Sequence, residues 1–142
     1  MKLIESYVYN GEGYNPSLVS KGWQVAYLNY APSESLEEID RLDIHFETDE
    51  VFVLLEGTAV LIAADFSQGN AHYDTVFMQP GVIYNIPCKT WHQIALYPGS
   101  RICIVEKDNT HVSDFEYYNL TPEQKKQLVD VVEQCRFLHL QS

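Results

Sequence analysis

The sequence is poor in positive charge and in long apolar runs. Nine lysines and arginines stand against twenty aspartates and glutamates, which gives a net charge of −11 over 142 residues. This charge disfavours phosphate backbones and anionic lipid surfaces, so we predict that the protein binds neither nucleic acid nor a membrane. No apolar run approaches the ~20 residues of a membrane span, and the N-terminus lacks the apolar stretch of a signal peptide. The sequence therefore predicts a cytoplasmic protein.

Cysteine is also scarce. The three cysteines, Cys88, Cys103 and Cys135, are an odd number and show no CxxC spacing. This pattern argues against a disulfide framework and against a zinc site made of thiolates, and it predicts reduced thiols. The chain has the common length of one domain, so we predict a single domain over residues 1–142.

What the chain does have is a series of short apolar or alternating segments, separated by Gly, Pro and Asn turns. These segments predict about eight strands, with a barrel core at about 23–107, and an all-β sandwich or jelly-roll barrel. Before them, residues 7–14 contain Gly11 and Gly13 and are predicted to be irregular. After them, Thr121 as N-cap and Pro122 at the first helical position predict a C-terminal helix at about 122–135.

The first stretch of chemical interest is Asp43–Gly57, DIHFETDEVFVLLEG. The alternation around its start places His45 on a charged face, and the opposite face carries Leu42, Ile44 and Phe46. Taken alone, such a strand is more typical of an ordinary amphipathic strand, by roughly two to one, than of a site. Glu50 then opens a strand that is apolar on both faces, which predicts a carboxylate close to the core.

The second stretch is Gly81–Leu96, GVIYNIPCKTWHQIAL. It places His92 on the apolar side of an alternating strand, where a lone histidine is more often a satisfied core residue than a ligand. Together, however, the two stretches hold two imidazoles and a carboxylate, His45, His92 and Glu50. This is the ligand set that an open-sided transition-metal site needs.

The two stretches resemble the two motifs of the cupin superfamily. The spacing of those motifs is kept throughout: four residues separate His45 from Glu50, six separate Glu50 from Gly57, and five separate Gly81 from Pro87, with His92 following at the motif distance. The residue types depart from the motifs at four positions, which are Asp43 for the first histidine, Lys89 for a glycine, Leu96 for the asparagine and Glu37 for the opening glycine. Two motifs in register are much more specific than either alone.

The resemblance implies a cupin-type jelly-roll β-barrel with a C-terminal helix. It implies that Asp43 and His45 turn into the barrel mouth with Glu50 and His92, while the Leu42 face packs elsewhere, for example at a subunit interface. The implied metal ligands are His45, Glu50 and His92, with Asp43 at the fourth position. Two nitrogens and two oxygens suit Fe(II), Mn(II), Ni(II) or Zn(II), and the sequence does not choose among them.

Two functions remain open, and no catalytic residue is assigned for either. One is a metal-dependent enzyme, such as an isomerase, epimerase, lyase or dioxygenase, in which the metal acts as Lewis acid on a small polar metabolite, a sugar or an oxo- or hydroxy-acid. The other is a non-catalytic small-molecule-binding module, with or without metal, in which an apolar pocket is lined by Phe46, Tyr84 and Trp91. Apolar faces left over on strands, together with the tendency of cupins to pair by their sheets, predict a homodimer.

Overall fold

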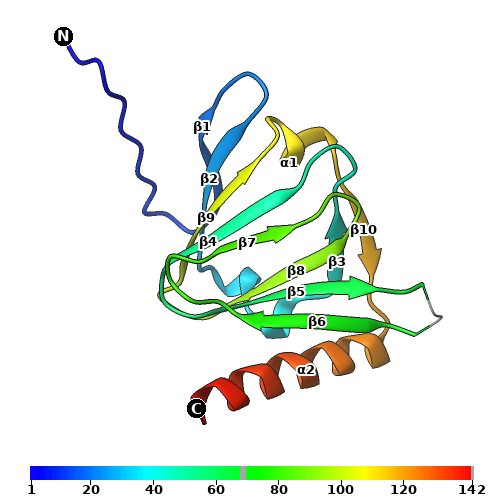
Figure 1. The fold of residues 1–142 in the computed structure, drawn as a ribbon. Helices are drawn as coiled ribbons and strands as arrows, with labels where there is room; N and C mark the ends of the chain where they lie inside the picture. Colours follow the sequence, from blue (N-terminus) through cyan, green and yellow to red (C-terminus); the bar gives the residue numbers. More distant parts are fainter. Residues whose placement is uncertain (68–69, 142) are drawn as a thin grey trace.

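The computed structural model describes residues 1–67 and 70–141 (Figure 1). Within these residues, ten strands form two five-stranded sheets in which neighbouring strands run antiparallel. The order in the first sheet is β1 (Gly13–Val19), β2 (Gln24–Asn29), β9 (Arg101–Glu106), β4 (Glu50–Glu56) and β7 (Ile83–Ile86). The order in the second sheet is β10 (Glu116–Asn119), β3 (Arg41–Ile44), β8 (Trp91–Leu96), β5 (Ala59–Asp65) and β6 (His72–Phe77). The fold is therefore all-β with a C-terminal helix, as predicted.

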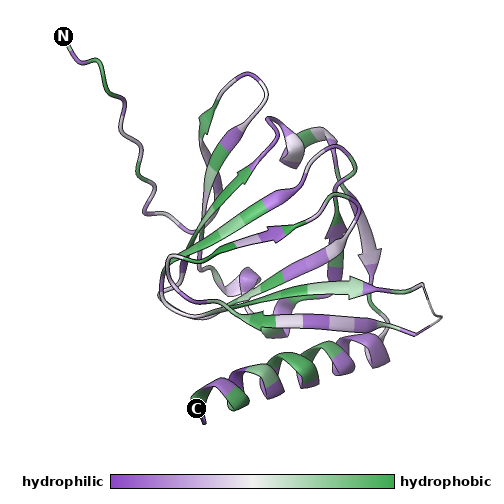
Figure 2. Ribbon diagram, in the orientation of Figure 1, coloured by the Kyte–Doolittle hydropathy of each residue, from purple (hydrophilic) through white to green (hydrophobic). Residues whose placement is uncertain are grey.

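The inner faces of the central strands change from apolar to ionisable at one end of the barrel. In β4 the inward residues run from Glu50 to Phe52 and Leu54, and the antiparallel β9 carries Ile104 and Glu106 beside them. Figure 2 shows this change along β4 as a passage from purple to green. The apolar end forms the core between the two sheets, so the ionisable end is left to form a site.

The outer face of the second sheet is covered by helix α2 (Pro122–Leu140), below β5 and β6 in Figure 1. Leu128 and Val132 of the helix are fully buried against Val60 and Ile62 of β5. This contact explains why β5 is apolar on both faces, because one face meets the core and the other meets the helix. The same apolar cluster also contains the buried residues Leu36, Ile39 and Ala95.

Helix α2 begins as predicted and ends later than predicted. Thr121 and Gln124 form a complete capping box, with each side chain bonded to the other residue's backbone N–H. The helix continues past Cys135 to Leu140 because no glycine or proline interrupts it. In this last part, Arg136 lies over the Tyr97 ring, with its guanidinium carbon 4.3 Å from the ring centroid.

Two strands lie outside the range 23–107, at the edges of the sheets. β1 pairs with β2, although residues up to 14 were predicted to be irregular, and its register shifts between Asn15 and Leu18. A bulge at a sheet edge tolerates Pro16, because an edge strand does not need every N–H for pairing. β10 pairs with β3 on the other side of the barrel. No helix in the described part of the chain is long and apolar enough to cross a membrane.

The apolar face predicted around Ile44 is covered within the single chain. Leu42 is fully buried and Ile44 is 5% exposed, so neither needs a partner subunit to cover it. Phe46 does not share their face, because β3 ends at Ile44 and the chain turns; its side chain is 41% exposed. The homodimer and the cytoplasmic location remain predictions from the sequence.

Candidate metal centre

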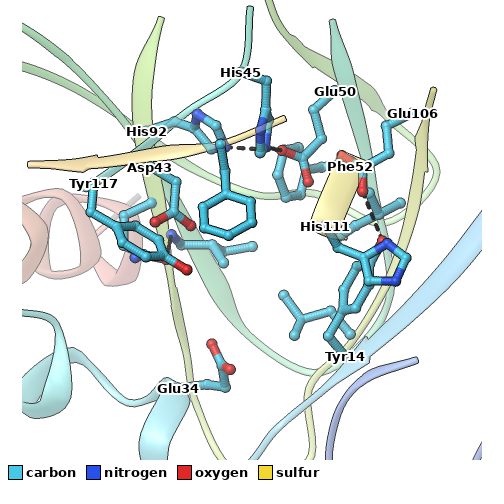
Figure 3. Close-up of a pocket in the computed structure, with 15 residues that line it drawn as sticks. Tyr14, Glu34, Asp43, His45, Glu50, Phe52, His92, Glu106, His111 and Tyr117 are labelled. Carbon is cyan, nitrogen blue, oxygen red and sulfur yellow. Dashed lines mark hydrogen bonds and ion pairs between the residues drawn. The ribbon is translucent and has the colours of Figure 1, made fainter. Parts of the chain in front are cut away.

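Three ionisable side chains from different parts of the chain meet at the open end of the barrel. His45 follows β3 directly, Glu50 is the first residue of β4, and His92 is the second residue of β8. One ligand atom from each lies within 4.8 Å of those of the other two (Figure 3). Glu50 and His92 are 7% and 5% exposed, so the group is almost shielded from bulk water.

The two histidine rings are both fixed by backbone carbonyls. Nδ1 of His45 lies 2.6 Å from the carbonyl oxygen of Asp114, and Nδ1 of His92 lies 2.9 Å from that of Thr90. A carbonyl oxygen only accepts hydrogen bonds, so each Nδ1 must carry the proton. In a neutral ring this leaves Nε2 with a free lone pair, which is the arrangement found in metal-binding histidines.

Both Nε2 atoms point at the same carboxylate oxygen. Oε1 of Glu50 lies 3.0 Å from Nε2 of His45 and 2.9 Å from Nε2 of His92. A lone pair and a carboxylate oxygen repel each other, so positive charge must lie among the three atoms. Protons on the rings or one bound cation would supply this charge.

The pKa values show how strongly the group attracts positive charge. Burial lowers the pKa of His45, but the hydrogen bond and negative charge of Glu50 outweigh burial and raise this pKa to about 9. The same balance raises the pKa of His92. Burial raises the pKa of Glu50, but the two imidazoles outweigh it and lower this pKa to about 2. Glu50 is therefore a carboxylate at any ordinary pH.

Asp43, the fourth predicted ligand, lies beside this group and outside it. Its Cα pairs in register with that of His92, and its carboxyl group lines the same cavity (Figure 3). Its oxygen Oδ1 is buried and has no hydrogen-bond partner. Burial raises the pKa of Asp43, against the opposing charges of His92 and Arg41. Among the described residues, the structure thus gathers three of the four predicted ligands.

A cavity of about 260 Å³ opens next to the group formed by His45, Glu50 and His92. Its walls include Tyr14, Glu34, Phe52, Glu106, His111 and Tyr117. The aromatic residues predicted for this role, Phe46, Tyr84 and Trp91, are not among its described lining residues. In β8 the inward position belongs to His92, so Trp91 points to the other side, where its ring packs on Tyr118 with centroids 5.8 Å apart.

Glu106 is the most informative residue that the sequence reasoning missed. The β4–β9 register pairs Val51 with Val105, and continuing it by one residue places Glu106 opposite Glu50. Tyr14 donates its hydroxyl proton to Oε1 of Glu106 at 2.7 Å, while the other oxygen, Oε2, is buried and has no hydrogen-bond partner. Burial, and then the charge of Glu50, raise the pKa of Glu106 to about 7. The sequence did indicate a buried Glu106, because strand alternation in Arg101–Glu106 places it on the same face as Ile102 and Ile104.

His111 was predicted to be a solvent-exposed residue in a polar connector. It is exposed, but it also lines the cavity from the single-turn helix α1 (Thr110–Ser113). Its Nδ1 lies 3.0 Å from the amide nitrogen of Gln24, which also donates to the Tyr14 hydroxyl at 2.9 Å. No local pattern marks this residue, because its neighbours in the cavity come from the other end of the chain.

The raised pKa of Glu106 predicts a pH-dependent cost to stability. Between pH 4.5 and about 7, the unfolded chain has released this proton while the folded chain still holds it, so stability falls as pH rises. Relative to Glu106→Gln, the wild-type free energy of unfolding should fall by about 2–3 kcal/mol across this window. Urea unfolding of both proteins in a metal chelator, at half-unit pH steps, measures the difference. Parallel pH curves for the two proteins would contradict the prediction.

Two histidines and a glutamate thus lie at one end of a two-sheet jelly-roll barrel, in the spacing of the two cupin motifs. No family model and no curated protein matches the chain. Among solved structures, it is similar to a protein from Bacillus halodurans, with 19% identity over 70% of this chain and 72% of the other and a TM-score of 0.51. At this identity the similarity establishes the fold alone.

Two further solved structures show weaker similarity. One is a cupin-2 domain containing protein from Shewanella frigidimarina, 20% identical over 70% of this chain and 84% of the other, with a TM-score of 0.48. The other is an oxalate oxidase, 16% identical over 61% of this chain, with a TM-score of 0.45. The chain spans 42% of the length of that oxidase.

Proposed function

We propose that this protein is a metal-dependent cupin that acts on a small polar metabolite bound at the barrel mouth. One divalent transition metal would be held by His45, Glu50 and His92. The observation that carries this proposal is the convergence of two imidazole Nε2 atoms on one buried carboxylate oxygen, with both rings fixed through Nδ1. Without a cation, this arrangement is stable only when protons take the cation's place.

The donor set fits Fe(II), Mn(II), Ni(II) or Zn(II). Two imidazoles and one carboxylate leave coordination positions free for water and for substrate oxygens. The backbone carbonyls of Asp114 and Thr90 fix the tautomer and direction of the two rings, which supports metal affinity and ligand orientation. When bound, the metal supplies Lewis-acid chemistry, since it polarises a carbonyl or hydroxyl oxygen of the substrate.

The cavity wall supplies a group that could hold or move a proton. Glu106 lies on the strand next to Glu50, and Tyr14 orients its carboxyl group through Oε1. The other oxygen is left free to meet the substrate, and a carboxyl group with a pKa of about 7 is suited to general acid–base catalysis. Phe52 and Ile104 form apolar wall beside it and limit the access of water. This favours an enzyme over the non-catalytic binding module.

Metal analysis of the purified protein tests the proposal. The protein is prepared without a metal-binding tag, and its metal content is measured by mass spectrometry before and after reconstitution with Fe(II), Mn(II), Ni(II) and Zn(II) in turn. We expect about one equivalent of at least one of these metals per chain. If the protein stays empty with all four, the metal-dependent function is wrong and the metal-free binding module takes its place.

A further inference from the structure

The cavity is strongly acidic. Four carboxyl groups line it, those of Glu34, Asp43, Glu50 and Glu106, and its described lining residues include no lysine or arginine. We infer that the end of the ligand that faces away from the metal is a hydrogen-bond donor, a hydroxyl or an ammonium group, and that Glu106 accepts its hydrogen bond. Ligands of this class are polyols, sugars and amino alcohols; dicarboxylates are excluded. The inference depends on the proposed function only for the end of the ligand that binds the metal.

The carboxyl groups of the cavity repel one another, and they would also repel a negatively charged group on the ligand. Burial is the largest cause of the raised pKa of Glu34, and the negative charge of Asp43 is the second. For Glu106, burial is again the largest cause of the raised pKa, and the negative charge of Glu50 is the second. A ligand carboxylate would add a further negative charge to groups that already repel one another in a poorly solvated space. A divalent metal would offset Glu50 first, because Glu50 is its ligand.

Of the basic side chains near the cavity, Arg41, His45 and His92 are already matched by other groups, and Nδ1 of His111 lies 3.0 Å from the amide nitrogen of Gln24. Arg41 lies over the ring of Tyr117, with its guanidinium carbon 3.7 Å from the ring centroid. It lines a neighbouring hollow together with four acids, Glu34, Glu38, Asp40 and Asp43. His45 and His92 both face Glu50. None of these groups is therefore available to neutralise a carboxylate placed near Glu106.

Two buried carboxyl oxygens in the cavity have no hydrogen-bond partner, which favours a ligand that donates hydrogen bonds. Glu106 is 5% exposed, and its Oε2 has no hydrogen-bond partner, while Oε1 accepts from Tyr14 at 2.7 Å and from Gln24 at 3.3 Å. Oδ1 of Asp43 is a second buried acceptor without a partner in the same cavity. Buried acceptors of this kind are normally paired, so a ligand that donates hydrogen bonds to these two oxygens would satisfy them.

The test uses three probes that share a metal-binding head and differ in the other end. The head is a hydroxamate, and the short tails end in an ammonium group (3-aminopropanohydroxamate), a hydroxyl group (3-hydroxypropanohydroxamate) or a carboxylate (succinic monohydroxamate). Binding to the metal-loaded protein is measured by calorimetry at low ionic strength. We expect the ammonium probe to bind at least about tenfold more tightly than the carboxylate probe, with the hydroxyl probe between them.

Variants separate the role of Glu106 from general surface charge. Glu106→Gln keeps the side-chain shape and an oxygen for Tyr14, and it should reduce the difference between ammonium and carboxylate probes to less than about threefold. Glu47→Gln is the matched control, because Glu47 is exposed and pairs with Lys107 at 3.3 Å outside the cavity; it should leave the order and the difference unchanged. Tighter binding of the carboxylate probe, or an unchanged difference in Glu106→Gln, would overturn the inference.

Metal content is measured in every sample, so that failure of the proposed function is seen separately. If the wild-type protein holds no metal, the three probes are compared by thermal shift on the metal-free protein at millimolar concentration. The same order of stabilisation then supports the inference, because the Glu106 wall does not depend on the metal. An equal or reversed order overturns it.

Discussion

Replacing His45 and His92 together by alanine should reduce the bound metal from about one equivalent to less than about a tenth of an equivalent per chain. The two imidazoles supply both nitrogen donors of the proposed site, and Glu50 alone, a single carboxylate, cannot hold a transition metal against water. Metal analysis of dialysed protein gives the stoichiometry. Calorimetric titration of each single variant should show affinity reduced at least about 100-fold.

Two further variants make this result specific. His72→Ala is the matched histidine control, because His72 is exposed at the start of β6, on the far edge of its sheet; it should keep full metal content. Glu50→Gln removes the carboxylate ligand without leaving a buried charge, so it should lose metal while circular dichroism shows a folded barrel. Full metal content in the double histidine variant would place the metal elsewhere in the protein.

The ligand group could be predicted because each member has a local signal. Glu50 heads an apolar strand, His92 lies on the apolar face of another, and the spacing to Gly57 and Gly81 matches two motifs at once. Strand alternation alone favoured an ordinary strand around His45 and a core histidine at His92, so the combined spacing of the two motifs was needed to place both side chains in one site. The position of Asp43 outside the group was not readable, because it depends on the cross-strand register with His92.

The opposite wall of the cavity depends on pairings between distant segments. Tyr14 and Glu106 meet because β1 and β9 flank β2, which the order of strands along the chain does not reveal. His111 arrives from a connector whose own sequence reads as an exposed polar turn. The sequence therefore predicts the side of the pocket that carries His45, Glu50 and His92 much better than the opposite side, which carries Tyr14, Glu106 and His111.

Lys89 shows where a departure from the motif leaves the geometry unchanged. The cupin motif has glycine at this position, and Lys89 adopts the left-handed backbone conformation, with φ of +65°, that glycine favours. Its backbone N–H donates to the carbonyl oxygen of His45 at 2.7 Å, which ties the loop before β8 to the residue that follows β3. The surrounding contacts thus hold an unfavourable backbone conformation at a point where it fixes the position of His45.

The second large effect is expected at Gly57, the last residue of the first motif. Gly57 has φ of +82°, and a Cβ placed on it would lie 2.5 Å from Cα of Ser100 and 2.8 Å from the carbonyl oxygen of Gly99. These are backbone atoms of a turn closed by the hydrogen bond from Ser100 N to Tyr97 O, so they cannot rotate away as a side chain would. Gly57→Ala should therefore lower the free energy of unfolding by about 3–5 kcal/mol.

Gly81→Ala separates the steric clash at Gly57 from backbone strain. Gly81 opens the second motif and has φ of +79°, nearly the same as Gly57, but a Cβ there would have no atom within 4 Å. Gly81→Ala should lower the free energy of unfolding by only about 1–2 kcal/mol, which is the cost of placing alanine in the left-handed backbone conformation. Urea unfolding of both metal-free variants measures the two losses, and equal losses would show that strain alone accounts for the Gly57 effect. A larger loss at Gly57 would mean that the first motif keeps its glycine because the turn at Ser100 must pack directly against this backbone, a requirement of the barrel that is independent of the metal.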